Sequence, residues 1–201
     1  MTSPISGLAP CFCHPSYLVR KKALKLLGGK VDIYAPDGTP VLCSLQKAFR
    51  LKEDIRLYSD DRKTNELLII SARQILDFSA AYDVVDAPTG TPLGALRRKG
   101  LQSLIQDKWE ILDPADQVIG TIEEDSIILA LVRRFATNLI PQRYDFKNLQ
   151  GQVIAEGNQH FNPFIYKLDL TMQMPGAQQS FDPRLLLASA VLLALIEGRE
   201  S

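Results

Sequence analysis

Two short clusters of basic residues carry the clearest chemical signal in this sequence. They are Arg20, Lys21 and Lys22 in the segment "VRKK", and Arg97, Arg98 and Lys99 in the segment "RRKG". Guanidinium groups and a backbone amide suit phosphate oxygens, and each cation near an anionic bilayer adds about 1 kcal/mol of attraction. The two clusters are therefore our candidates for contact with an anionic lipid headgroup. Ordinary solvated strand ends, with Asp107 and Glu110 balancing the second cluster, explain the same residues.

The few soft or nucleophilic side chains do not indicate a metal or catalytic site. Cys11, Cys13 and His14 form the segment "CFCH", whose spacing is tighter than that of structural zinc ligands. The remaining soft candidates, Cys43 and His160, lie far away in the sequence, and a nucleophilic pair would also need an activated thiolate. The sequence contains no nucleophile elbow, Gly-rich phosphate loop or zinc-protease motif. We therefore expect no enzyme activity, no metal and no cofactor.

The composition describes one folded domain without a global charge. Lys and Arg total 23, as do Asp and Glu, so the basic excess of a general nucleic-acid binder is missing. The 201 residues, 46% of them hydrophobic, are enough for a buried core. An odd number of cysteines favours a reducing compartment, and the N-terminus lacks the features of a secretory signal. We predict a flexible leader over residues 1–16 and a single cytoplasmic domain over residues 17–201.

Five segments have the pattern of a β-hairpin, in which two alternating runs flank a break rich in Pro, Gly, Asp or Asn. These segments begin at Val31, Glu53, Tyr82, Trp109 and Tyr144. Their uneven spacing argues against a solenoid or a propeller. A single antiparallel meander, closed into a barrel that removes its edges, fits better, so the predicted fold is mainly β. Trp109 heads a strand and is expected in the core rather than in a ligand platform.

The segment "EEDSIILALVRRFATNLIP" interrupts this pattern of strands. A short helix over residues 126–136, capped by Asp125 or Ser126 and stopped by Pro141, explains it. A buried strand through residues 127–132 is the competing interpretation, because short apolar runs do not distinguish a helix from a strand.

The apolar run over residues 185–196 contains one hydroxyl and no charge. A helix of this length rises about 18 Å, against a bilayer core of about 30 Å. Lengthening it would bring charged residues into lipid at about 2.5–3.5 kcal/mol each, so we do not expect an integral membrane protein. Asp182, Pro183 and Gly198 instead mark the two ends of a helix over residues 183–197. Because this helix is apolar all round, it must lie inside the barrel.

These hairpins and this helix resemble the tubby C-terminal-like superfamily, and are most similar to LURP-one-related and phospholipid-scramblase-like proteins, including small bacterial members. The resemblance runs from Tyr17 to Arg199 and rests on the order of hairpins, the central "RRKGLQSLIQDKWEILD" and the helix ending "EGR". It implies a barrel of about twelve strands threaded by the C-terminal helix. It also implies phosphoinositide binding, as in tubby domains, or calcium-dependent lipid movement, as in scramblases. The segment "DLTMQMPGAQQSFD", however, offers only Asp169 and Asp182 as calcium ligands, which are too few.

We therefore predict a non-enzymatic cytoplasmic β-barrel, peripheral at the membrane, that binds anionic phospholipid headgroups or a membrane-associated partner. A structural or protein-interaction domain without a lipid role is the first alternative. A scramblase-like lipid-handling protein, and an enzyme or carrier that uses the barrel interior for a small ligand, are the others. No nucleic acid is expected as a partner. The deciding question is whether the basic residues of the two clusters converge on one face of the barrel.

Overall fold

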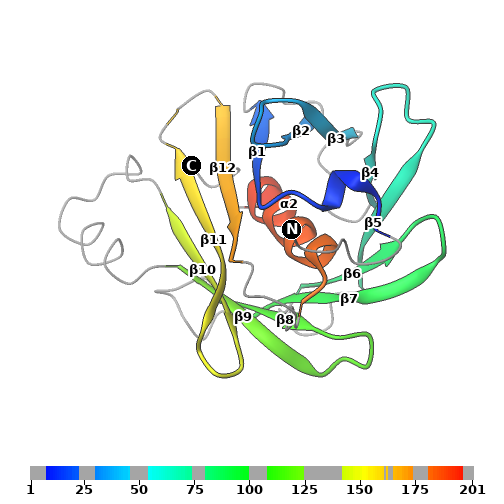
Figure 1. Ribbon diagram of the computed structural model, residues 1–201. Coiled ribbons are helices and arrows are strands. Elements are labelled where there is room, and N and C mark those ends of the chain that lie inside the picture. Colours follow the sequence, from blue (N-terminus) through cyan, green and yellow to red (C-terminus); the bar gives the residue numbers. More distant parts are fainter. Residues whose placement is uncertain are drawn as a thin grey trace.

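Strands whose side chains alternate between two faces make up most of the protein, as the period-two pattern predicts. The computed structural model describes residues 8–22, 30–45, 54–73, 80–99, 108–124, 142–160, 162, 165–173 and 181–196. Within these ranges lie a short 3-10 helix, twelve strands and one α-helix (Figure 1). In chain order they are η1 (Pro10–Phe12), β1 (Ser16–Lys22), β2 (Lys30–Tyr34), β3 (Pro40–Leu45), β4 (Ile55–Tyr58), β5 (Glu66–Ala72), β6 (Ala81–Asp86), β7 (Thr91–Arg98), β8 (Lys108–Leu112), β9 (Val118–Glu124), β10 (Arg143–Asn148), β11 (Val153–His160), β12 (Ile165–Met172) and α2 (Pro183–Ile196).

The strands form one closed antiparallel barrel in which each pairs with its neighbours in the chain and β1 pairs with β12. Hairpin connections join β2 to β3, β4 to β5, β6 to β7, β8 to β9 and β10 to β11 at one end, which we call the hairpin rim. The odd-numbered strands run away from this rim and end at the opposite rim. The predicted mainly-β barrel and its five hairpins are confirmed.

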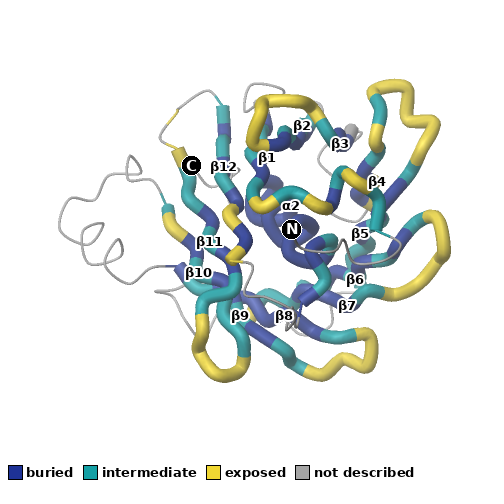
Figure 2. The backbone as a smooth tube through the Cα atoms, viewed as in Figure 1, coloured by how far each residue is buried: buried dark blue, intermediate teal, exposed yellow. Residues whose placement is uncertain are grey.

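Helix α2 occupies the middle of the barrel and has no exposed side (Figures 1 and 2). All of its residues are buried except Arg184, and the inward side chains of the strands pack around it. Full burial of its eight Leu, Ile and Val side chains is worth roughly 12–24 kcal/mol as an upper bound. No helix in the described part of the chain is long and apolar enough to cross a membrane. Trp109 lies in the same core at 2% exposure, as predicted.

The N-terminal end of α2 is anchored by a carboxylate on each side of one arginine. Asp182 accepts a hydrogen bond from the backbone N–H of Arg184 at 2.9 Å, so it caps the helix as expected. The guanidinium of Arg184 then contacts Asp182 at 2.6 Å and Asp86 of β6 at 2.8 Å. These ion pairs fasten the first turn of the helix to the hairpin rim.

The C-terminal end of α2 is held by Lys21, which reaches inward from β1. Its Nζ donates to the carbonyl oxygens of Ala194 at 3.2 Å and Leu195 at 3.4 Å, and the residue is only 5% exposed. The last carbonyls of a helix lack partners within the helix, and a cation there also offsets the negative end of the helix dipole. Lys21 therefore supplies a donor to two backbone carbonyls at the buried end of the described helix. The predicted helix end at Gly198 lies outside the described residues.

The segment before β1 packs on the barrel. Phe12 of η1 is 3% exposed and belongs to the hydrophobic core. The hydroxyl of Tyr17 donates to the carbonyl of Cys11 at 3.0 Å and accepts from the backbone N–H of His14 at 3.2 Å. The predicted flexible leader over residues 1–16 is therefore wrong for residues 8–16, because an aromatic side chain tethers them.

The helix predicted over 126–136, and the competing strand over 127–132, lie outside the described residues.

Replacing the lysine at the end of α2 tests the anchoring of the helix. We expect Lys21→Met to lower the free energy of unfolding by about 1–3 kcal/mol, because two buried carbonyl oxygens lose a donor. Urea unfolding followed by circular dichroism measures the change. Arg62→Met, in the exposed β4–β5 turn, is the control and should shift the value by less than about 0.5 kcal/mol. Equal stability of Lys21→Met and the unaltered protein would contradict the anchoring role.

Candidate functional site

The barrel places the two basic clusters on opposite walls. β1 carries the first and β7 the second, and six steps separate these strands in either direction around the ring. At about 4.8 Å between neighbouring strands, opposite walls of a ring of twelve lie about 18 Å or more apart. Both clusters stand near the rim opposite the hairpin rim, but they do not converge on one face.

Two members of the second cluster share one carboxylate within the protein. Arg97 donates from Nε and Nη2 to Glu110 Oε2 at 2.8 and 2.6 Å, and Lys99 Nζ lies 2.7 Å from Oε1 of the same carboxylate. The Glu110 side chain is 8% exposed. Arg98 is half-buried and makes interactions of its own. The competing explanation, a strand end whose charges Glu110 balances, therefore describes Arg97 and Lys99. Asp107, the other acidic residue considered, lies outside the described residues.

Glu110 stays ionised because its two cationic partners outweigh its burial. Desolvation raises the pKa of this carboxyl, but hydrogen bonds from Lys99 and Arg97 lower it more, so the pKa is lower than its usual 4.5. The carboxylate thus remains charged at neutral pH and holds both cations.

The first cluster is divided by the pleat of β1. Consecutive side chains on a strand point to opposite faces, so Lys21 points into the barrel and Arg20 points out. Lys21 therefore does not contribute to an outer basic surface, contrary to its prediction as a headgroup candidate. The side chain of Lys22 lies outside the described residues. Arg20 is the one member of this cluster whose described side chain faces outward.

Arg20 lies directly opposite a second cation, Lys167 of β12. Neither residue has an ion pair among the described residues, and Arg20 Nε is a buried nitrogen without an acceptor there. Asp32 lies opposite Arg20 on β2, but it pairs with Lys30 at 2.9 Å. Most other cations on the described strands contact a carboxylate: Lys30, Arg56, Arg97, Lys108, Arg143 and Lys147.

Two unpaired like charges facing each other across neighbouring strands destabilise the sheet. An anion between them would remove this repulsion. Because Arg offers a planar set of N–H donors and Lys a mobile point charge, the pair suits a phosphate group.

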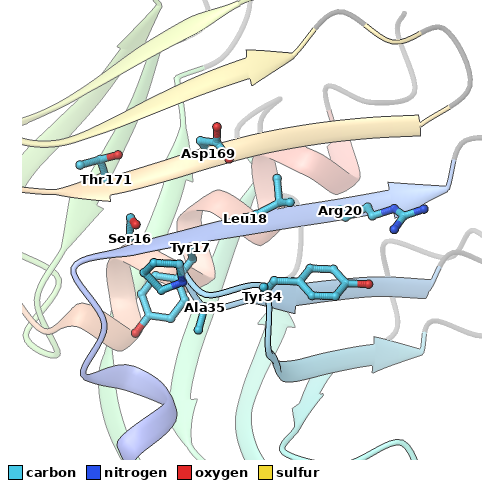
Figure 3. A pocket seen from close by; sticks show the side chains of 10 residues that line it. Ser16, Tyr17, Leu18, Arg20, Tyr34, Ala35, Asp169 and Thr171 are labelled. Atoms are coloured by element: carbon cyan, nitrogen blue, oxygen red, sulfur yellow. The ribbon is translucent and has the colours of Figure 1, made fainter.

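A groove on the outer wall begins at Arg20 (Figure 3). It has a volume of about 460 Å³ and crosses β12, β1, β2 and the β2–β3 turn. Arg20 lies at one end, Ser16 and Thr171 lie toward the other, and Leu18 and Tyr34 lie between them (Figure 3). The groove thus combines a cation, hydroxyl groups and an aromatic ring on a rigid sheet.

Comparison with known proteins gives one match. The family model of LURP-one-related proteins matches residues 41–194. The chain belongs to the LURP-one-related family. This family lies within the tubby-like superfamily, which agrees with the predicted resemblance. No curated protein and no solved structure matches the chain.

In this LURP-one-related barrel a carboxylate completes the groove. Asp169 follows Lys167 by two residues on β12 and lies opposite Leu18 of β1. Its Oδ2 is 2.5 Å from Nε2 of His160 on β11, and both side chains are about half exposed. Sequence analysis did not predict that Asp169 lines this groove, that Lys167 faces Arg20, or that His160 contacts Asp169. The sequence indicates only that alternate residues of β12 face outward. That alternation identifies neighbours of Arg20 only when the pairing of β12 with β1 is known.

The cysteines do not form a reactive group with the histidines in the described residues. Cys43 of β3 and His160 of β11 lie four strands apart around the ring. Burial raises the pKa of Cys43 to about 11 and that of Cys11 to about 11, so both thiols are protonated at neutral pH. Among the described residues, no three His, Cys, Asp or Glu side chains cluster as a metal site.

Removing one of the two facing cations tests their repulsion. We expect Lys167→Gln to raise the free energy of unfolding by up to about 1 kcal/mol at low ionic strength, with a gain that shrinks in high salt. Urea unfolding at two salt concentrations measures it. Lys108→Gln is the matched control, because Lys108 pairs with Glu123 at 2.5 Å and its loss should not stabilise the protein. A Lys167→Gln variant that is less stable at low salt would contradict the repulsion.

The pairing of Glu110 predicts a pH-dependent loss of stability. Its folded-state pKa is lowered, so its contribution is fully present above the usual value of 4.5 and disappears as pH falls through the lower folded value. We expect Glu110→Gln to lower the unfolding midpoint temperature at neutral pH, with a difference that narrows below pH 4.5. Asp54→Asn, at an exposed carboxylate 3.4 Å from Arg56, is the control and should have little effect at neutral pH. A constant difference at all pH values would contradict this ion-pair role.

Proposed function

We propose that this LURP-one-related barrel is a non-enzymatic module that binds anionic phospholipid headgroups through Arg20 and Lys167 on its outer wall. The facing, unpaired cations are the observation that carries the proposal. On a chain with equal numbers of acidic and basic residues, they form a local positive site rather than a positive surface. The module would act peripherally at the cytoplasmic face of a membrane.

The occupied interior supports a role for the outer wall. Thirteen residues of α2 are buried among the inward side chains of the barrel, so the helix fills the space in which a carrier would hold its ligand. The groove, in contrast, opens to solvent between strands whose backbone is fixed by neighbours on both sides.

The two acidic residues considered as calcium ligands have other partners. Asp169 lies on the outer wall beside His160, whereas Asp182 caps α2 and pairs with Arg184. This separation argues for headgroup binding without calcium and against a scramblase-like mechanism.

Two cations near an anionic surface give weak, reversible binding. Each contributes about 1 kcal/mol, and salt screens the attraction within a Debye length of about 8–10 Å. We therefore expect membrane affinity that rises with the fraction of anionic lipid and falls with ionic strength.

Vesicle sedimentation tests the proposal, using phosphatidylcholine vesicles with increasing phosphatidylglycerol or phosphatidylserine. We expect Arg20→Gln and Lys167→Gln each to lower the partition coefficient roughly fivefold, the equivalent of about 1 kcal/mol per cation. Arg62→Gln removes one unpaired cation from the exposed β4–β5 turn and is the matched control, with an expected loss below about twofold.

Two results would overturn the proposal. One is the absence of salt-sensitive sedimentation, and the other is an equal loss in all three variants. Capture of a stoichiometric protein partner by a barrel that does not sediment with vesicles would instead favour the interaction-domain alternative.

A further inference from the structure

We infer that the groove is selective for a phosphate that carries an ammonium group, the chemistry of an aminophospholipid headgroup. This inference rests on the proposed function and specifies the ligand of the same groove. It comes from the carboxylate of Asp169, which lies on the same outward face as the two unpaired cations.

The three charged groups occupy adjacent rows of the sheet. Arg20 and Lys167 face each other in one row, and Asp169 lies in the next row, opposite Leu18. Two residues along a strand correspond to about 7 Å. The two-carbon linker of an ethanolamine or serine phosphodiester, together with the long side chains of Arg20 and Lys167, can bridge this distance. The site therefore presents two positive groups and one negative group, which complements a phosphate with a nearby ammonium.

Asp169 is oriented for such a contact. His160 holds its Oδ2 at 2.5 Å, while Oδ1 makes no hydrogen bond to a described residue. Lys167 is two residues away on the same strand, but its Nζ does not pair with this carboxylate. One oxygen of a fixed carboxylate is thus available at the wall of the groove, where an ammonium can donate to it.

The size and lining of the groove also exceed what a lone phosphate needs. Its volume of about 460 Å³ lies in the range of small-molecule sites, about 300–1,000 Å³. The ring of Tyr34 and the side chain of Leu18 offer apolar contact beyond Arg20, and the hydroxyls of Ser16 and Thr171 can bond to ester oxygens (Figure 3). A headgroup with its linker fits this combination better than inorganic phosphate does.

The same charges disfavour an inositol polyphosphate. Several phosphates would need more cations than the two unpaired ones that the described part of this wall supplies. Asp169 would also repel any phosphate placed in its row. The selectivity inferred here therefore differs from the phosphoinositide binding that the resemblance to tubby domains implied.

Titration of the whole protein with two soluble phosphates, followed by NMR chemical shifts, tests the selectivity. Phosphoethanolamine and glycerol 3-phosphate share the phosphate, but only the first carries an ammonium. We expect phosphoethanolamine to bind roughly fivefold more tightly, and Asp169→Asn, which keeps a partner for His160, to abolish this preference. Lys167→Gln should weaken both ligands. Asp54→Asn, with 43% side-chain exposure against 45% for Asp169, is the matched control and should change neither.

Vesicles containing equal fractions of phosphatidylserine or phosphatidylglycerol then test the lipid source, because both lipids carry one net negative charge. We expect stronger sedimentation with phosphatidylserine, and a loss of this difference in Asp169→Asn. Equal binding of both soluble phosphates would overturn the inference while leaving the proposed function intact. No sedimentation with either lipid would overturn both. Selective binding of soluble phosphoethanolamine without a vesicle preference would overturn the lipid source.

Discussion

The burial of α2 is the constraint on which the rest of the structure depends. A helix that is apolar on every side can avoid water only if a sheet surrounds it, and a sheet that surrounds it has no edges left. Burial then requires partners for the polar groups at both ends of the helix. Asp182, Arg184 and Asp86 provide them at one end, and Lys21 provides them at the other. The hydrophobic core and these buried polar contacts are therefore both required to bury the helix.

This arrangement is the reason why the proposed function is assigned to the outer wall. The interior is packed, and the carboxylate of Glu110 pairs with both Arg97 and Lys99. What remains on the described strands is a wall with paired charges almost everywhere, and one place where two cations face each other and neither makes an ion pair. On a neutral chain, such a local imbalance says more about a ligand than the number of basic residues does. Membership of the LURP-one-related family gives the architecture, and the groove gives the hypothesis about a ligand.

The basic cluster on β1 shows how the same residue type acquires different roles. Lys21 and Arg20 are adjacent in the sequence, yet one completes the helix inside the barrel and the other faces solvent. Similarly, Arg97 in β7 and Lys99 directly after it share Glu110, as the predicted balance of the strand end anticipated. Clusters in a strand therefore need to be divided by parity before their charges are counted together.

Local patterns in the sequence determined the five hairpins, the helix from Pro183 and the buried position of Trp109, because alternation, turn residues and capping act over a few residues. They were not enough to predict that Phe12 ties the N-terminal segment to the core. The tertiary structure alone decided that Arg20 faces Lys167 and that Asp169 lies in the next row. This register joins the first strand to the last, and it depends on how twelve strands close around α2 rather than on any turn between them.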